Sequence, residues 1–188
     1  MDYRNGIKRY LDLEIEVIKS LDVDAINSIM NEIKASQERG STIYVCGNGG
    51  SHATASHFCC DFNKGVSGEQ EKNTNFVCLA DNVPTIMAIA NDLSYDEIFS
   101  YQLKNRLKPG DIVFAISGSG NSKNVVRAME VAKDKGNKII GLCGFTGGKV
   151  KEMSDICLHV NINNMQITED VHMIMDHVMM FVLAGYTL

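Results

Sequence analysis

Two short loops rich in glycine and serine carry the groups best suited to bind an anion. The first reads Cys46-Gly47-Asn48-Gly49-Gly50-Ser51-His52, and the second reads Ser117-Gly118-Ser119-Gly120-Asn121-Ser122. Each leaves a predicted strand and enters a predicted helix, so backbone amides and the positive end of the helix dipole favour a negative charge. The serine hydroxyls of the second loop add donors for a phosphate monoester. A tight turn with serine caps is the alternative for either loop taken alone.

Nucleotide-binding motifs do not explain these loops. His52 stands where a dinucleotide-binding loop requires its third glycine, and Gly144 to Val150 lacks the spacing and the Lys-Ser/Thr pair of a nucleotide phosphate loop. The formal charge of -5, from 18 basic and 23 acidic residues, provides no basic footprint for a nucleic acid. Nucleic acid is therefore disfavoured as the main ligand.

His57 and Asp61 form a second candidate site. They lie four residues apart in the helix predicted after the first loop, and therefore on one face of that helix. This spacing suits joint metal binding or proton transfer. A solvated surface pair is the alternative, but the helix begins at the proposed ligand loop, which favours a functional interpretation.

The predicted last helix is unusually polar at its start. Glu169, Asp170, His172, Asp176 and His177 stand among residues typical of a core, and ionisable groups in such a setting must be paired, hydrated or functional. A capped helix start with a buried, hydrogen-bonded histidine is the alternative. Glu169 and His177 lie two turns apart with about 80° between them, so both reach one site only from the side.

The elements that position these residues alternate between short apolar strands and helix-length segments. Two N-terminal helices are predicted, over about Tyr3 to Lys19 and from Asp22 to a stop at Gly40, and a last helix over about Thr168 to Ala184. Continuous apolar strands without alternation indicate a mainly parallel sheet with helices on both faces. The predicted strands are Thr42–Cys46, Phe76–Leu79, Ile112–Ile116, Lys138–Cys143 and Ile156–Val160.

Length and composition fit one globular domain. The 188 residues are 45% apolar and 22% charged, so the chain can bury a core. We expect one domain over residues 1–188, with a helical pair at 1–40 and an α/β core at 41–188. The N-terminus lacks the apolar segment of an export signal, and no apolar run is long enough to cross a bilayer. The six cysteines show no disulfide pattern, and a cytoplasmic location is expected.

Together these motifs resemble a known family. Their order and spacing over essentially the whole chain are similar to the sugar isomerase (SIS) domain of phosphoheptose isomerases. The residues that carry the resemblance are the two N-terminal helices, Gly47-Asn48-Gly49-Gly50-Ser51, His57-Phe58, Ala90-Asn91-Asp92, the loop at 117–122, and Val171-His172 with His177 in the last helix.

The resemblance implies a fold, a reaction and an assembly. The fold is a doubly wound, three-layer αβα sandwich with a five-stranded parallel sheet. The implied reaction converts sedoheptulose 7-phosphate to D-glycero-D-manno-heptose 7-phosphate, an entry step to the heptose of lipopolysaccharide or capsule. The assembly is a homotetramer with active sites at subunit interfaces. Nucleic acid and membrane are not implied partners.

The resemblance also assigns roles to residues. Proton transfer through an enediol falls to Asp61 and His177, and a zinc or other divalent ion is implied at His57, Asp61, Glu169 and His177. The implied substrate-binding residues are Asn48, Gly49, Gly50, Ser51, Asp61, Asn91, Asp92, Ser117, Gly118, Ser119, Ser122 and Glu169.

Two departures from the family bear on the metal. The family usually has Glu at the position of Asp61, so the carboxylate here is one methylene shorter. It usually has Gln where Glu169 stands, and a second carboxylate should bind a divalent ion more strongly. The alternatives are a non-catalytic SIS protein that binds a sugar phosphate in a regulatory role, and an isomerase or epimerase of another sugar phosphate.

Overall fold

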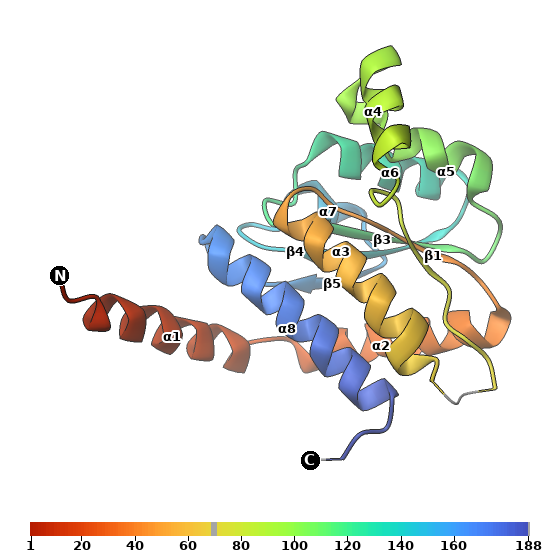
Figure 1. Ribbon diagram of the computed structural model, residues 1–188. Coiled ribbons are helices and arrows are strands. Elements are labelled where there is room, and N and C mark those ends of the chain that lie inside the picture. The colour runs from red at the N-terminus through yellow and green to blue at the C-terminus, as the bar shows by residue number, and fades with distance from the viewer. Residues whose placement is uncertain (69–70, 188) are drawn as a thin grey trace.

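A five-stranded, wholly parallel sheet forms the centre of the protein (Figure 1). The computed structural model describes residues 1–68 and 71–187. The predicted doubly wound sheet is confirmed, with the strand order β2-β1-β3-β4-β5. The strands are β1 (Ile43–Cys46), β2 (Phe76–Cys78), β3 (Ile112–Ser117), β4 (Lys138–Cys143) and β5 (Ile156–His159). All five lie within two residues of their predicted bounds.

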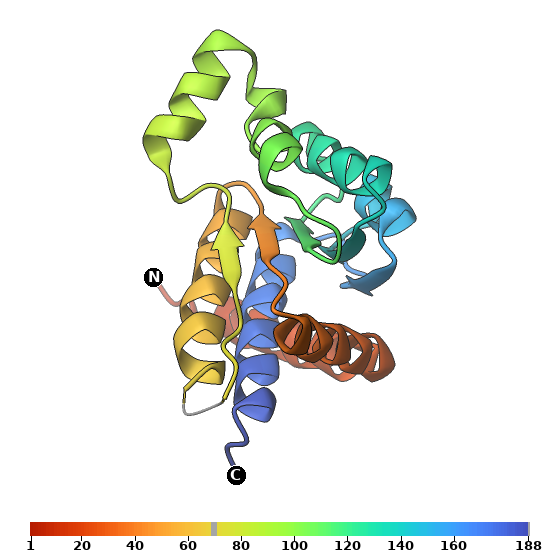
Figure 2. The ribbon, with the colours of Figure 1, turned by 90° about the vertical axis from the view of Figure 1, so that its right-hand side faces the viewer.

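Helices cover both faces of the sheet and make the predicted three layers (Figure 2). One face packs against α2 (Val23–Arg39), α3 (Gly50–Cys60) and α8 (Met165–Leu183). The other face packs against α5 (Ser100–Arg106), α6 (Lys123–Asp134) and α7 (Gly148–Met153). Apolar side chains on alternate sides of β3, such as Val113 and Phe114, are fully buried in the two separate cores. This double coverage explains why the strands read as continuous apolar runs.

Local signals in the sequence set both ends of α2 and the start of α8. Asp22 caps α2 by accepting a hydrogen bond from the amide of Ala25 at 3.0 Å, and Gly40 ends this helix with φ of 69°. The last helix starts at Met165, three residues before the prediction. The side chain of Asn164 accepts from the amide of Ile167 and nucleates that extra turn.

An aromatic cluster fixes α3 on the sheet. Phe58 stacks on Phe62 with centroids 5.5 Å apart and contacts Phe114 of β3 at 5.1 Å. Phe62 belongs to a π-helical segment, η1 (Asp61–Val66), which continues α3 without a break. Such segments are rare and often occur at functional sites. Here the segment starts at the candidate residue Asp61.

Two helices stand away from the sheet. The first, α1 (Arg4–Lys19), extends from the body as an arm, and the hydroxyl of Tyr10 donates to Asp170 at its base (Figure 1). The other, α4 (Val83–Asp92), rises beyond the carboxyl ends of the strands and is followed by a short 3-10 turn, η2 (Tyr95–Glu97). Within the described residues, no helix combines the length and apolar character needed to span a membrane. The division into one domain stays a prediction.

Candidate active site

The two glycine-rich loops lie side by side, because β1 and β3 are neighbours in the sheet. Asn48 of the first loop and Asn124 at the start of α6 exchange amide hydrogen bonds of 2.8 and 2.9 Å. The hydroxyl of Tyr95 donates to the same Asn48 oxygen at 2.9 Å. Both loops open at the carboxyl edge of the strands, where doubly wound proteins bind ligands.

Backbone geometry accounts for the glycines of the first loop. Gly49 has φ of 55°, which disfavours other residues. A Cβ on Gly47 would lie 2.6 Å from the carbonyl oxygen of Ser51. Ser51 is buried under this turn, whereas Gly49 and Gly50 are exposed and present the first amides of α3. The loop therefore offers backbone rather than side-chain donors.

The second loop offers hydroxyls beside the first turn of α6. The Ser117 and Ser122 oxygens lie 3.1 Å apart, and Ser119 accepts only a long hydrogen bond, 3.3 Å, from the amide of Asn121. Gly118 is buried, and its carbonyl accepts from the amide of Gly144 at 2.9 Å, which fixes the loop from below. Three hydroxyls at a helix N-terminus suit a phosphate group.

Glu169 lies with these loops and not with the histidines. Its carboxylate packs against the Cα of Gly50, at the position that a Cβ of that residue would occupy. Asn91 and Asp92 end α4, where the amide of Asn91 donates to Asp92 at 2.9 Å. Within residues 1–68 and 71–187, the structure brings neither of these two to the glycine loops.

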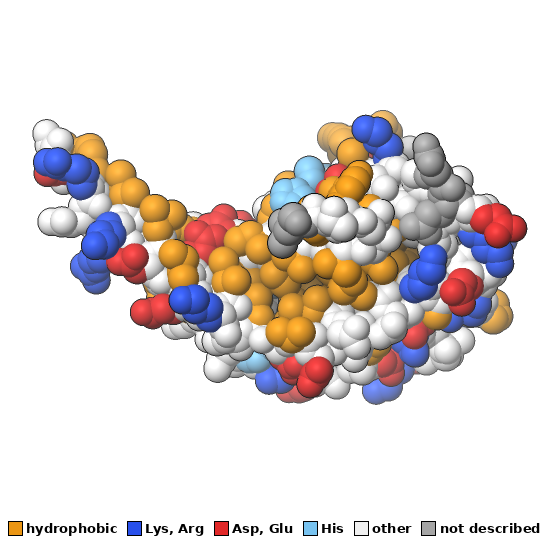
Figure 3. Space-filling view, turned by 90° about the horizontal axis from the view of Figure 1, so that it is seen from below, with side chains coloured by type: hydrophobic (Ala, Val, Ile, Leu, Met, Phe, Trp, Pro, Cys, Tyr) orange, Lys and Arg blue, Asp and Glu red, His pale blue; other side chains and the backbone are white. Residues whose placement is uncertain are grey.

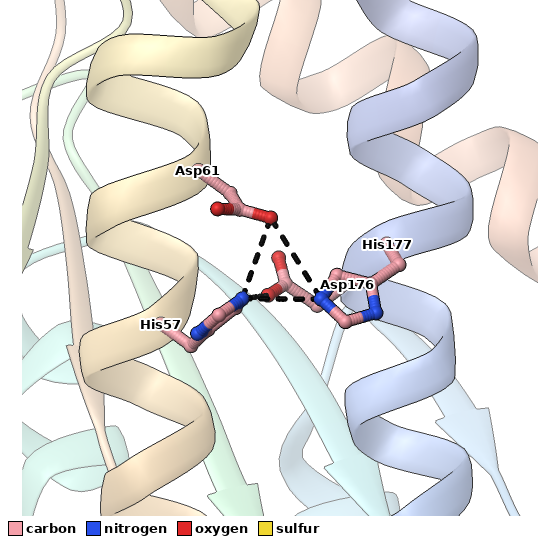
Figure 4. A group of neighbouring side chains, drawn as sticks. All are labelled: His57, Asp61, Asp176 and His177. Carbon is pink, nitrogen blue, oxygen red and sulfur yellow. Dashed lines mark hydrogen bonds and ion pairs between the residues drawn. The ribbon is translucent and has the colours of Figure 1, made fainter.

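Four donors meet where α3 and η1 face α8 (Figure 4). His57 Nε2 lies 3.1 Å from His177 Nε2 and 3.5 Å from Asp61 Oδ2, and the same Asp61 oxygen lies 4.0 Å from His177 Nε2. The fourth member is Asp176, whose Oδ2 is 3.9 Å from His57 Nε2. The predicted metal residues His57, Asp61 and His177 are therefore neighbours, and Asp176 joins them.

Burial gives Asp176 an unusual protonation equilibrium. The side chain is 0% exposed, and desolvation, with the nearby charge of Asp61 adding to it, raises the pKa of Asp176 to about 8. From the sequence, Asp176 stands only among the ionisable groups of the last helix and has no role of its own. A carboxylate in the buried stripe of Val171, Met175 and Met179 was the available signal, but its partners lie more than a hundred residues earlier in the chain.

The cluster fits a divalent cation. Two imidazole nitrogens with carboxylate oxygens are donors that zinc and related ions accept. Ligands of one tetrahedral ion at about 2.0–2.2 Å lie about 3.3–3.6 Å from one another. The donor atoms of the four side chains all lie within 4.8 Å, so small side-chain adjustments would suffice.

Comparison with known proteins agrees with this fold. A family model described as "SIS domain" matches residues 3–144, and the chain belongs to the SIS domain family. Two similar curated relatives carry the name phosphoheptose isomerase, one of them as probable. The chain is 36% identical to a probable phosphoheptose isomerase of Thermoplasma acidophilum, over 90% of this chain and 93% of the relative. It is also 36% identical to a phosphoheptose isomerase of Rhodospirillum rubrum, over 82% of each.

A solved structure extends the likeness to three dimensions. The phosphoheptose isomerase of Francisella tularensis superposes with a TM-score of 0.89 at 28% identity, over 97% of this chain and 98% of that one. The α/β SIS fold expected from the sequence is thus confirmed over nearly its whole length.

Proposed function

We propose that this protein is a phosphoheptose isomerase that interconverts sedoheptulose 7-phosphate and D-glycero-D-manno-heptose 7-phosphate. The relatives named above support the substrate. The observation that carries the proposal is the pairing of a serine-rich phosphate loop with a separate acid–base cluster, because a pure binding module has no need of Asp61 and His177.

The loops hold the substrate in this proposal. Ser117, Ser119 and Ser122 donate to the phosphate, together with the amides at Gly118 and at the start of α6. Asn48, Gly49, Gly50 and the neighbouring Ser51 backbone orient the sugar hydroxyls, with the Glu169 carboxylate accepting from one of them. These roles follow from the half-buried hydroxyls of Ser119 and Ser122, from the exposed Gly49 and Gly50, and from the place of Glu169 beside Gly50.

Asp61 and His177 move the proton. Isomerisation removes a proton from one carbon and returns it to the next through an enediol, so it needs a base and an acid on one face of the sugar. Asp61 takes the carbon-bound proton, and His177 exchanges a proton with the substrate oxygen and reverses role in the second half-step. A divalent ion, zinc in the proposal, would be held by His57, Asp61 and His177 and would stabilise the developing oxyanion.

The two halves of the site lie at different levels of α8. Glu169 and His177 are eight residues apart, a rise of about 12 Å along a helix. Within one chain the Glu169 carboxylate lies at Gly50 and not in the cluster, so in this proposal its contact with the metal comes from another copy of the chain. Asn91 and Asp92 reach the loops of another copy in the same way. We assign the active form to a homotetramer whose sites combine residues of neighbouring subunits. Exposed apolar side chains on α1 and α4 support such contacts.

A cytoplasmic location belongs to the same proposal. All six cysteines are free thiols, including Cys143 and Cys157, whose sulfurs lie 3.5 Å apart. This is the state that reducing compartments maintain.

Proton NMR of sedoheptulose 7-phosphate in D₂O tests the proposal. We expect deuterium incorporation and an aldoheptose signal with the parent protein, and loss of both with Asp61→Ala and with His177→Ala. Asp12→Ala, on the exposed arm, is the matched control. No exchange into this sugar by the folded parent, with or without zinc, contradicts the proposal. Thermal stabilisation by a different sugar phosphate would then favour another substrate or a regulatory binding role.

A further inference from the structure

We infer that Asp176 is itself a metal ligand, so that the cation is held by two histidines and two aspartates, His57, Asp61, Asp176 and His177. The inference deepens the proposed function, since it concerns the metal of the same site. It adds a ligand from the buried side of the cluster, on the residue directly before His177.

Asp176 has no hydrogen-bond partner among the described residues. Its side chain is 0% exposed, and neither oxygen has a hydrogen-bond partner among the residues that the structure describes. A buried carboxylate without a donor is costly, and buried charges are otherwise paired or bound to a metal. The nearest basic atom is His57 Nε2, which lies 3.9 Å from Asp176 Oδ2, too far for a hydrogen bond. A cation between them satisfies both.

The four donors approach the cluster from two helices. His57 and Asp61 extend from one face of α3 and the start of η1, and Asp176 and His177 extend from adjacent positions on α8 (Figure 4). His57 Nε2 lies between 3.1 and 3.9 Å from one donor atom of each of the other three. Four donors from two helices thus face one point, where a cation could contact all of them.

The short side chain of Asp61 also favours a second carboxylate at the metal. The resemblance to phosphoheptose isomerases leads one to expect Glu at this position, and Asp is shorter by one methylene. Asp61 Oδ2 accordingly remains 4.0 Å from His177 Nε2. A second carboxylate from α8 makes up for the shorter reach and brings the ligand charge to −2, which balances a divalent ion with two neutral imidazoles.

A structural role for Asp176 makes a different prediction. If the residue is a neutral carboxylic acid that only fills space, then Asp176→Asn keeps its shape and leaves metal affinity unchanged. If it is a ligand, the amide is a much weaker donor to a divalent ion. Asp170→Asn is the matched control, because Asp170 lies on the same helix and accepts from Tyr10, away from the cluster.

The experiment titrates metal-free protein with Co²⁺ and with Zn²⁺, following the Co²⁺ absorption bands and competition with a chelator, without any sugar. We expect Asp176→Asn to lose more than the ~10–100-fold in affinity that removal of an outer-shell partner causes. The Co²⁺ bands should also change in position or intensity. Asp170→Asn should bind as the parent does.

Thermal unfolding tests independently whether Asp176 binds the metal. Without metal, Asp176→Asn should melt at or above the temperature of the parent, because a costly buried carboxylate is gone. With saturating Zn²⁺ the order should reverse, since only the parent gains the full stabilisation from binding. This measurement also shows that the variant folds.

Two results overturn the inference: a parent protein that binds neither ion, or an Asp176→Asn affinity within threefold of the parent. Because no substrate is used, failure of the isomerase assay leaves the metal result standing, and tight metal binding without isomerisation separates the two proposals.

Discussion

Ser119 differs from the other two serines of its loop in what it already binds. The hydroxyls of Ser117 and Ser122 lie 3.1 Å apart, whereas the Ser119 hydroxyl has, among the described residues, only the 3.3 Å contact from the amide of Asn121. It is therefore the hydroxyl most free to turn towards a phosphate. A hydrogen bond to a charged group contributes about 1.5–3 kcal/mol, which corresponds to at least about tenfold in binding.

We expect Ser119→Ala to raise KM for the sugar phosphate by about tenfold or more, with kcat within a factor of about three, because the bond is equal in ground and transition states. Steady-state kinetics measures both constants. Ser28→Ala, on an exposed face of α2, is the control. An unchanged KM would remove Ser119 from the phosphate site.

His172 links burial to the pH dependence of stability. Burial lowers the pKa of His172 to about 4, and the facing carbonyl of Cys143 opposes this only in part. The unfolded chain has a pKa near 6.5. As the pH falls from about 6.5 to about 4, the unfolded state takes up a proton that the native state does not. The stability from the neutral ring is complete above this window and is lost within it, by up to about 3 kcal/mol.

Denaturant unfolding at about pH 7 and about pH 4.5 measures this effect. The parent should lose more free energy of unfolding between the two values than His172→Gln does, because the glutamine does not titrate. Comparing the two proteins cancels the groups that they share. Equal losses would show that His172 is not the group responsible.

The sequence predicts site residues that lie close together on one helix or loop, but not those that come together only by packing. The spacing of His57 and Asp61 is enough to predict that they share a helix face, and the loop glycines are enough to predict tight turns. Asp176 was not assigned, because its helix position resembles core and its partners on α3 become neighbours only through tertiary packing. The π-helical segment that carries Asp61 has no known signature in residue type.

At the scale of elements, the strands and helix ends agreed closely with expectation because each depends on short-range chemistry. Continuous apolar runs give buried parallel strands, and Asp22 and Gly40 bound α2 by a cap and a positive φ. The start of α8 was misplaced because the cap at Asn164 lies outside the apolar periodicity. The cluster takes its residues from α3, η1 and α8. How these helices pack against each other cannot be predicted from a local sequence pattern.

Helices α3 and α8 meet at the loops, where Gly50 contacts the Glu169 carboxylate. A methyl group on Gly50 would overlap the Glu169 carboxylate, the mobile end of a flexible side chain. Gly50→Ala should displace Glu169 and lower kcat/KM by about 10²-fold, the cost of a displacement near 1 Å. Stability should change little, since alanine favours the helix by up to about 1 kcal/mol.

Gly120→Ala is the contrasting variant. Gly120 has φ of 68°, and its methyl group would overlap the backbone of Gly147, which cannot turn aside. We expect a loss of about 1–3 kcal/mol in the free energy of unfolding. Kinetics and denaturant unfolding of both variants separate the two effects. A Gly50→Ala protein with parental activity would show that Glu169 has no part in the reaction.

The projecting helix α1 carries a stripe of exposed apolar side chains. Ile7, Leu11 and Ile15 recur at every fourth position of α1 and are 58%, 52% and 49% exposed. Figure 3 shows hydrophobic side chains along the arm and on the adjoining surface of the body. Apolar stripes of this kind mark sites of protein association. In the proposed tetramer, the stripe packs against a second copy and brings together half-sites that one chain holds about 12 Å apart.

Leu11→Lys tests this arrangement, because a charge in the middle of the stripe must be desolvated without a partner when subunits meet. Size-exclusion chromatography with light scattering should show a tetramer for the parent and smaller species for the variant. Isomerase activity should fall in parallel as the shared sites come apart. Asn5→Lys adds the same charge outside the stripe, about 120° around α1 from its centre, and should leave mass and activity unchanged. Full activity from a monomer would instead place the whole reaction within one chain.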